Sequence, residues 1–360
     1  MAVASTDADY DWATEVKKFN DTKSGVKGLV DAGVTKLPRF FLHPPENLPH
    51  PASTSCSLEL PIVDFGGGGR RAEVVEEIRR AASTWGFFRI VNHGVPVEVM
   101  EAMLAAVKRF HEQPAAEKMG YYSGNRMDRV RFTSSVPKRE SDAACWRDLL
   151  TIVYQDDHLD PQILPLACRE EVEEYVKYMI PLRETMAELL SEALGLSSDH
   201  LSKMECMKSE ALACLYYPVC PEPDKTLGQV KHSDTSFITL LMQDSIGGLQ
   251  ILHNNQWVDV PPLPGSFIAN IGDLMQIISN DKFISAEHRV LAQPTDSRVS
   301  VACFFTPSTN AISKPLMPIK ELVSDDRPAA YREFLFMEYI QYALGRGQHV
   351  HSALPRFRIP

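Results

Sequence analysis

The sequence lacks several patterns that would place it in other classes of protein. Its seven cysteines contain no CxxC pair and no regular spacing, which argues against a disulfide framework or a zinc site and favours reduced thiols. No apolar run reaches the roughly 18 residues that a transmembrane helix requires. No lysine- or arginine-rich cluster is present and the net charge is −10, which argues against a nucleic-acid partner.

The two ends of the chain also lack address signals. Residues 1–7 contain neither the charged nor the apolar region of a secretory signal peptide, and residues 356–360 carry no retention or peroxisomal address. With 360 residues, 44% of them hydrophobic and 23% charged, the chain has the composition of a globular protein with a large core. We therefore expect a cytoplasmic protein without membrane contacts.

Composition and periodicity divide the chain into five segments. They are an N-terminal arm that is polar and then proline-rich (1–57), a mixed N-terminal region (58–165), a helical connector (166–209), a β-rich core (210–308) and a C-terminal helix with a tail (309–360). Apolar residues at helical spacing predict helices near residues 28–34, 71–85, 96–112, 170–196 and 329–344. We expect the arm to be largely irregular.

The β-rich core has the clearest pattern. It contains eight short β-prone runs separated by Pro, Gly, Asn and Asp, with no predicted helix between them. The runs cover residues 211–217, 226–232, 237–243, 248–253, 256–260, 266–271, 285–290 and 299–306. This pattern predicts a mainly β protein with flanking helices, whose core is a double-stranded β-helix, or jelly roll, rather than a βαβ fold.

Two histidines and an aspartate in this core are candidate metal ligands. His232 and Asp234 alternate along a predicted strand, so both side chains can point to one face. His288 lies on a separate predicted strand that can return to the same end of a jelly roll. Two histidines and one carboxylate on one face of Fe(II) are the ligands of non-haem iron oxygenases. The HxD pattern is short, however, and the alternative for His288, which spacing favours less, is a buried, hydrogen-bonded core histidine.

A second constellation follows shortly after. Arg298 and Ser300 share one face of a predicted strand, where a guanidinium and a hydroxyl can hold a carboxylate, and Tyr217 could add a phenolic donor. The alternative is that Arg298 pairs with Asp296 at a surface turn. Three candidate metal ligands beside a candidate carboxylate clamp favour a site that holds both a metal and a dianion.

Sequence motifs extend this constellation along nearly the whole chain. They are residues 25–31, 61–65, 85–88, 92–95, 216–223, 231–234, 247–251, 256–260, 270–274, 279–283, 287–290 and 298–302. Together these motifs resemble the plant 2-oxoglutarate/Fe(II)-dependent dioxygenases. The opening segment resembles the subgroup of 1-aminocyclopropane-1-carboxylate oxidase homologues, whose members mostly oxidise specialised metabolites.

The resemblance implies roles for particular residues. His232, Asp234 and His288 would bind Fe(II); Arg298 and Ser300 would hold the distal carboxylate of 2-oxoglutarate, together with Tyr217. The substrate pocket would be lined, by position, by Phe132, Ala213, Thr235 and Phe304, which suits a flat hydrophobic molecule. One position departs from the family pattern: Leu215 replaces the Asn or His that usually precedes Tyr-Tyr-Pro, so a polar group near the cosubstrate is missing.

The resemblance also implies an activity. The protein would be a monomeric enzyme that uses Fe(II), 2-oxoglutarate and O2, with ascorbate as an optional activator. It would hydroxylate or otherwise oxidise a small hydrophobic or aromatic specialised metabolite and release succinate and CO2. Asp234 argues against halogenation, because a carboxylate ligand leaves no place for chloride. Two alternatives stay open: an ascorbate-dependent oxidase that does not use 2-oxoglutarate, and a non-catalytic jelly-roll protein that binds a small ligand.

Overall fold

The computed structural model describes residues 10–49, 58–66, 69–137, 139–345 and 352–360. Two parts of the chain on which the sequence supported predictions, residues 1–7 and Cys56, lie outside these ranges. The six cysteines within them are buried free thiols, as predicted. No helix of the described chain combines the length and the apolar character needed to cross a bilayer.

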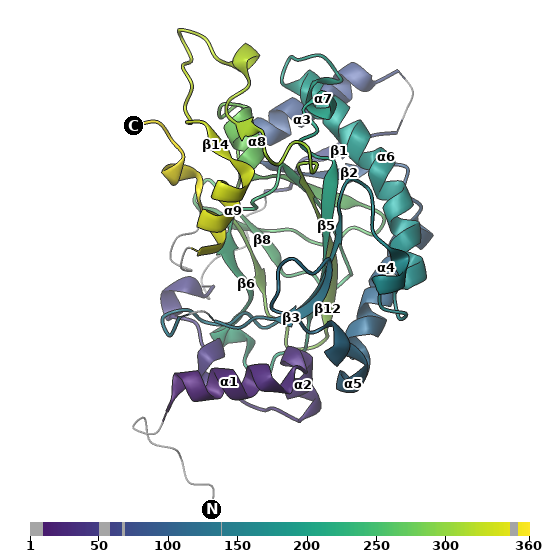
Figure 1. Ribbon diagram of the computed structural model, residues 1–360, viewed down its shortest axis with the longest axis vertical. Helices are drawn as coiled ribbons and strands as arrows, with labels where there is room; N and C mark the ends of the chain where they lie inside the picture. The colour runs from purple at the N-terminus through teal and green to yellow at the C-terminus, as the bar shows by residue number, and fades with distance from the viewer. Residues whose placement is uncertain (1–9, 50–57, 67–68, 138, 346–351) are drawn as a thin grey trace, which may run out of the picture.

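Two β-sheets form the centre of the molecule (Figure 1). The large sheet contains β1 (Ile62–Asp64), β2 (Phe87–Val91), β3 (Val130–Ser134), β4 (Asp148–Tyr154), β5 (Ser209–Tyr217), β7 (Ile238–Gln243), β10 (Phe267–Ile271) and β12 (Arg298–Thr306). The small sheet contains β6 (Leu227–His232), β8 (Leu249–His253), β9 (Gln256–Asp259) and β11 (His288–Leu291). Their orders are β1-β2-β10-β7-β12-β5-β4-β3 and β6-β11-β8-β9.

The connectivity confirms the predicted jelly roll. From β5 to β12 the chain passes back and forth between the two sheets, interrupted only by the β8–β9 hairpin within the small sheet. All eight predicted runs of the core are strands, with ends that differ by a few residues. β1 to β4, from the segment predicted at residues 58–165, extend the large sheet on both sides.

The alternation of side chains gives the large sheet two different apolar faces. On β5, Leu212 and Cys214 point to a core beneath the helices, whereas Ala213, Leu215 and Tyr217 point into the space between the two sheets. β7, β10 and β12 alternate in the same way. The inner face therefore belongs to the jelly-roll interior, and the outer face is available for helix packing.

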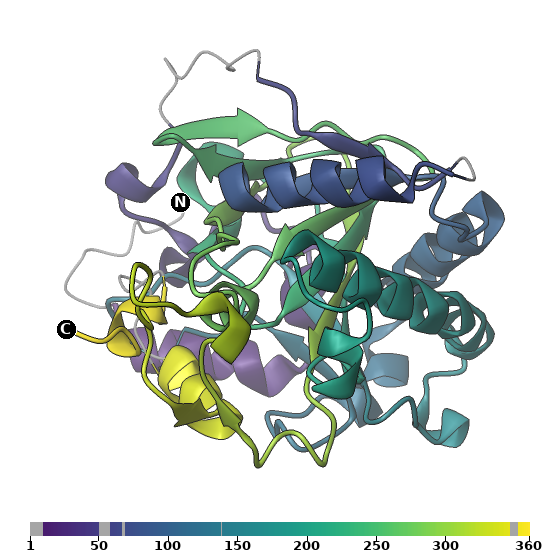
Figure 2. The same cartoon turned by 90° about the horizontal axis from the view of Figure 1, so that it is seen from above.

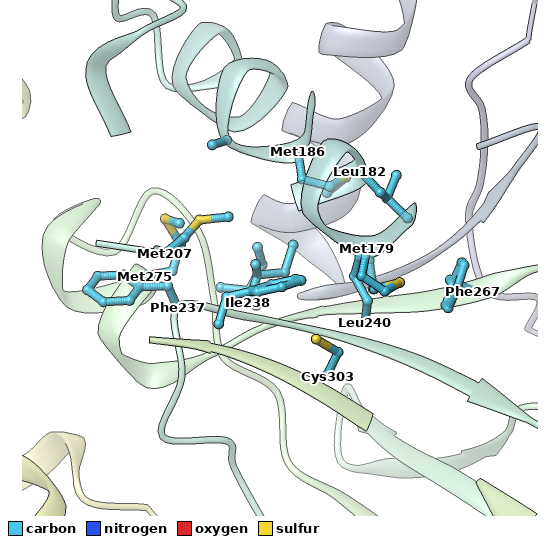
Figure 3. Close-up of a cluster of buried hydrophobic side chains, with 14 of the residues drawn as sticks. Met179, Leu182, Met186, Met207, Phe237, Ile238, Leu240, Phe267, Met275 and Cys303 are labelled. Atoms are coloured by element: carbon cyan, nitrogen blue, oxygen red, sulfur yellow. The ribbon is translucent and has the colours of Figure 1, made fainter. Parts of the chain in front are cut away.

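Three long helices cover the outer face of the large sheet. They are α3 (Arg71–Thr84), α4 (Val97–Glu112) and α6 (Arg169–Ala193), and both α3 and α4 pack against α6. Figure 2 shows α4 and α6 on the side of the molecule away from the yellow C-terminal segment. In Figure 3, Met179 and Met186 of α6 meet Ile238 and Leu240 of β7 in a cluster without polar side chains. These three helices were predicted from their apolar spacing.

The N-terminal arm is more regular than predicted: the short helix expected near residues 28–34 is present a few residues earlier, and a further helix precedes it. It contains α1 (Trp12–Thr22) and α2 (Gly25–Asp31), which lie together near β3 and β4 (Figure 1). Asp11 caps α1 by accepting hydrogen bonds from the amides of Ala13 and Thr14. The buried face of α1 packs against aromatic rings further along the arm. The apolar stripe of α1 is short, with only Val16 and Phe19 buried, so composition alone did not reveal it.

The C-terminal helix begins later than predicted. α9 (Phe336–Gly345) follows β14 (Phe334–Leu335), which pairs with β13 (Pro315–Leu316). Just before β14, the carbonyl of Ala330 accepts from the amide of Ile359, and the amide of Arg332 donates to the carbonyl of Phe357. Residues 329–335 cannot be helical because their backbone groups pair with the tail and with β13.

The remaining helices are short. They are α5 (Ala115–Lys118), α7 (His200–Lys203), α8 (Asp273–Ile278) and the 3-10 turns η2 (Arg39–Phe41), η3 (Pro45–Asn47), η4 (Met119–Tyr121), η5 (Pro161–Ile163), η6 (Pro223–Lys225), η7 (Lys320–Leu322) and η8 (Leu354–Arg356).

Candidate active site

A cavity of about 310 Å³ lies between the two sheets of the jelly roll. Its walls are mainly apolar, with Leu215, Leu241 and Leu249 among the lining residues, and Leu344 of α9 reaches its edge. About half of the lining residues nevertheless have polar side chains, and these include the two constellations predicted from the sequence. The cavity therefore combines a mainly apolar surface with side chains that can bind a metal or a carboxylate.

The three predicted metal ligands meet in this cavity. His232 ends β6 and His288 begins β11, and the two residues face each other across the antiparallel pair. Asp234 lies in the loop just after β6, not on the strand itself. The Nε2 atoms of His232 and His288 lie 3.5 and 3.6 Å from Oδ1 of Asp234, so all three side chains converge on one point.

Backbone carbonyls fix the orientation of both imidazoles. Nδ1 of His232 lies 2.9 Å from the carbonyl oxygen of Val230, and Nδ1 of His288 lies 3.4 Å from that of Ala286. Because a carbonyl oxygen can only accept, these contacts favour a proton on Nδ1, more clearly for His232 than for His288, and so leave Nε2 available as a ligand atom. This is the tautomer that a metal-binding histidine requires.

The two oxygens of Asp234 have different surroundings. Oδ2 accepts a hydrogen bond from the Thr239 hydroxyl and another from the Asn270 amide, each at 2.7 Å. Oδ1 is the atom that faces both histidines. The neighbours therefore hold one oxygen in place and leave the other available as a ligand.

The protonation states also suit a metal. Burial lowers the pKa of His232 to about 3, with a contribution from the nearby His288, so His232 is neutral near pH 7. Burial by itself would raise the pKa of Asp234, but His288, His232 and the hydrogen bonds from Thr239 and Asn270 lower it overall. Neutral imidazoles and an ionised carboxylate are the forms that coordinate a divalent cation. Two nitrogen donors and one oxygen donor beside an open cavity fit Fe(II).

A buried guanidinium lies in the same cavity. Arg298 is 0% exposed and donates to the Ser300 hydroxyl at 3.0 Å and to Oε1 of Gln243 at 2.8 Å. The ring of Tyr217 lies 4.9 Å from its Cζ atom. Among the described residues no carboxylate forms an ion pair with Arg298, so the alternative pairing with Asp296 is wrong. A buried cation held only by neutral partners is suited to the carboxylate of a ligand.

Of the predicted pocket residues, Ala213, Thr235 and Phe304 line the cavity, but Phe132 does not. Phe132 is fully buried on the other face of the sheet, where its ring packs against Phe110 and His111. The reason is the alternation along the strand: Phe132 on β3 pairs with Leu150 on β4, and both point toward the helices. The prediction that Phe132 lines the pocket is wrong.

Several polar residues of the site were missed from the sequence. Thr239 and Gln243 lie on β7 and Asn270 lies on β10, and each is a polar side chain on the inner face of an otherwise apolar strand. That pattern was the available signal, since a polar residue on a buried face needs a partner. Leu215, the departure from the family pattern, lies opposite Ser300 in the sheet register and adds an apolar patch beside Arg298.

Comparison with known families identifies two matching regions. Residues 208–307 match the 2OG-Fe(II) oxygenase superfamily, and residues 60–171 match the family described as non-haem dioxygenase in morphine synthesis N-terminal. The first region contains the histidine–aspartate cluster and Arg298. The second contains β1 to β4 with α3 and α4.

Similar curated proteins match over almost the entire chain. The 1-aminocyclopropane-1-carboxylate oxidase homolog 1 of Arabidopsis thaliana is 46% identical over 357 residues, which cover 98% of each chain. A probable 2-oxoacid dependent dioxygenase of Arabidopsis thaliana is 43% identical, covering 98% of this chain and 99% of that protein.

Solved structures share the architecture. JOX2, crystallised in complex with 2OG, Fe and JA, superposes with a TM-score of 0.79 at 29% identity, covering 93% of this chain and 98% of the other. The rice dioxygenase for auxin oxidation superposes with a TM-score of 0.69 at 27% identity, covering 84% of this chain and 100% of the other.

Proposed function

The chain belongs to the 2-oxoglutarate/Fe(II)-dependent dioxygenases, and from that premise we propose that it oxidises a small hydrophobic or aromatic metabolite. It is an enzyme whose cofactor and cosubstrates are Fe(II), 2-oxoglutarate and O2. Hydroxylation is the proposed outcome, and another oxidation would require only a different position of the substrate in the same cavity.

We assign His232, Asp234 and His288 as the Fe(II) ligands. Their convergence, their favoured tautomers and the hydrogen bonds to Asp234 support this assignment. When bound, Fe(II) and 2-oxoglutarate would supply the activation of O2: one oxygen atom would enter succinate as the cosubstrate loses CO2, and the other would convert a C–H bond of the substrate to C–OH. The protein positions the metal, the cosubstrate and the substrate, and it keeps bulk water out of the cavity.

We assign Arg298 and Ser300 to the distal carboxylate of 2-oxoglutarate, with Tyr217 packed beside the guanidinium. Arg298 is oriented before any ligand arrives, because Ser300 and Gln243 accept its hydrogen bonds and β5 pairs with its strand. A dianion that reaches from this clamp toward the metal cluster occupies the polar part of the cavity. The single observation that carries the proposal is that both groups line one buried cavity.

The remaining walls support the substrate class. Ala213, Leu249 and Phe304 provide apolar surface within the cavity of about 310 Å³, which suits a small molecule with an apolar body. Among the structural relatives, one was crystallised with JA and another is named for auxin oxidation. We further propose that the enzyme acts in the cytoplasm as a monomer, with ascorbate as an optional activator; the buried free thiols suit a reducing compartment.

Succinate formation from 2-oxoglutarate tests the proposal. Asp234→Ala should lose Fe(II) binding and all turnover. Arg298→Ala should keep the metal but raise the KM for 2-oxoglutarate by roughly tenfold or more, since a charged hydrogen-bonded pair is lost. Asp296→Ala is the matched control, because Asp296 lies next to this strand and does not pair with Arg298. Full activity of Asp234→Ala would refute the metal assignment.

A further inference from the structure

A second guanidinium, that of Arg147, enters the cavity from the edge of β4. Its two neighbours in the chain are buried and fixed. The Trp146 amide donates to the carbonyl of Leu227, and its indole Nε1 donates to that of Pro218, while Asp148 accepts from the amides of Val26 and Lys27. The backbone is thus held on both sides, and Arg147 shares the cavity-facing side of β4 with Leu149.

Among the residues that the structure describes, none pairs with the side chain of Arg147. Its Nε atom is buried without a hydrogen bond, and no described residue forms an ion pair or a side-chain hydrogen bond with its guanidinium. The Nε atom of Arg298 also lacks a hydrogen bond, but Ser300 and Gln243 accept from the two Nη atoms of Arg298, and no such acceptor is present for Arg147 among the described residues. A buried N–H donor without an acceptor lowers the stability of the folded protein, and a ligand that accepts a hydrogen bond from it would remove this cost.

We propose that Arg147 binds a carboxylate of the substrate, so that the enzyme acts on small hydrophobic carboxylic acids. This inference rests on the proposed function, in which Arg298 and Ser300 already hold the distal carboxylate of 2-oxoglutarate. A planar guanidinium matches a carboxylate with two parallel hydrogen bonds. A single cation in an apolar wall neutralises one negative charge, which fits a carboxylate better than a dianionic phosphate.

Paired acids and esters provide the test. The anaerobic complex of the full-length protein with Fe(II) and 2-oxoglutarate is titrated with 1-naphthylacetic acid, 3-phenylpropanoic acid and cyclohexylacetic acid, and with the methyl ester of each. We expect at least one acid to bind roughly tenfold or more tightly than its ester, the range expected for a hydrogen-bonded charged group. In Arg147→Gln this preference should fall to near one, and Arg147→Lys should restore only part of it.

Controls separate the possible outcomes. Arg129→Gln removes an exposed arginine that donates to the carbonyl of His158 and should leave the acid preference unchanged. The affinity for 2-oxoglutarate should be the same in wild type and Arg147→Gln. The inference is overturned if no acid is preferred over its ester, if Arg147→Gln keeps the preference, or if the variant instead raises the 2-oxoglutarate requirement. If wild type forms no complex with Fe(II) and 2-oxoglutarate, the proposed function itself fails before any acid is added, and this inference fails with it.

Discussion

The hydrogen bonds around Asp234 determine which of its oxygens can serve as a ligand. Thr239 and Asn270 both donate to Oδ2, whereas Oδ1 faces the histidines. Such partners of a metal ligand typically change metal affinity by about 10- to 100-fold when they are removed. The Thr239 hydroxyl should therefore matter although it does not touch the metal position.

We predict that Thr239→Val weakens Fe(II) binding by roughly tenfold or more without changing the fold. Valine keeps the volume of threonine but cannot donate to Oδ2. Equilibrium titration with Fe(II) under anaerobic conditions measures the effect. Ser236→Ala is the control, because the Ser236 hydroxyl contacts Thr239 but not Asp234. Equal Fe(II) affinity in wild type and Thr239→Val would show that this hydrogen bond has no part in metal binding.

Glu210 is a buried carboxyl group that the reaction does not use. Burial raises its pKa from the ordinary value of 4.5 to about 7, and the Cys303 thiol donates to its Oε2 atom. Between pH 4.5 and 7 the folded protein therefore holds a proton that the unfolded chain has released. The contribution of this group to the free energy of unfolding falls as the pH rises through that window. Above about pH 7 the folded protein carries the full cost of ionising the buried Glu210 carboxyl group.

Glu210→Gln should accordingly change the pH dependence of unfolding. The free energy of unfolding of the variant minus that of wild type should be larger at pH 8 than at pH 4.5. The increase should reach up to about 3 kcal/mol for a pKa shift of this size. Urea unfolding at several pH values gives the difference. The exposed Glu333→Gln is the control and should show no such trend. A constant difference between Glu210→Gln and wild type across this range would contradict the assigned protonation.

The candidate metal and carboxylate residues could be singled out from the sequence, but the residues that support them could not. His232, Asp234, His288 and Arg298 have side chains with a specific chemistry at a recognisable spacing. Gln243, by contrast, is one of two polar residues on a mostly apolar strand, and its role follows from which face of the sheet it occupies. That face is determined by the pairing of strands far apart in the sequence.

At the level of elements, α2 is attached to the large sheet by Asp148 of β4. The buried carboxylate accepts hydrogen bonds from the amides of Val26 and Lys27, each at 2.8 Å, and from the Ser134 hydroxyl. Gly25 makes this contact possible, because its φ is +71° and a Cβ atom there would lie 2.4 Å from the Asp148 carboxylate. The first turn of α2 is thus capped by a residue more than a hundred positions away.

We predict that Asp148→Ala lowers the free energy of unfolding by about 1–3 kcal/mol, the cost of a lost cap that leaves buried amides unpaired. Gly25→Ala should destabilise the same contact through the steric conflict. Denaturant unfolding measures both variants. Asp21→Ala, at an exposed ion pair on α1, should change stability by less than about 0.5 kcal/mol. If Asp148→Ala unfolds like wild type, the cap does not stabilise the arm.

Elements with strong periodicity were predictable, and those fixed by tertiary pairing were not. α3, α4, α6 and the strands of the core have long or regular apolar patterns, which burial on one face requires. The start of α9 was misplaced because the backbone around Ala330 and Arg332 pairs with the tail instead. Phe132 was assigned to the cavity although the register of β3 and β4 turns it to the opposite face.

At the level of the whole molecule, the cavity is assembled from all parts of the chain. The metal cluster comes from the small sheet and the loop after β6, Arg298 comes from the large sheet, Arg147 comes from the N-terminal region, and α9 contributes Leu344. The predicted segments are therefore not independent units around the site. The sequence indicated the chemistry of this site, whereas the shape of its apolar walls depends on how the two sheets and the C-terminal helix pack together.

The central claim is that one cavity holds Fe(II) on the His232–Asp234–His288 cluster and 2-oxoglutarate on Arg298. Anaerobic titration of the metal-free protein with Fe(II) and 2-oxoglutarate, followed by visible absorption, tests it most directly. We predict a weak charge-transfer band that requires both additions, is absent in Asp234→Ala, and in Arg298→Ala appears only at higher 2-oxoglutarate concentration. Iron binding without a band would contradict the assignment of the cosubstrate site, and failure to bind iron would contradict the assignment of the metal site.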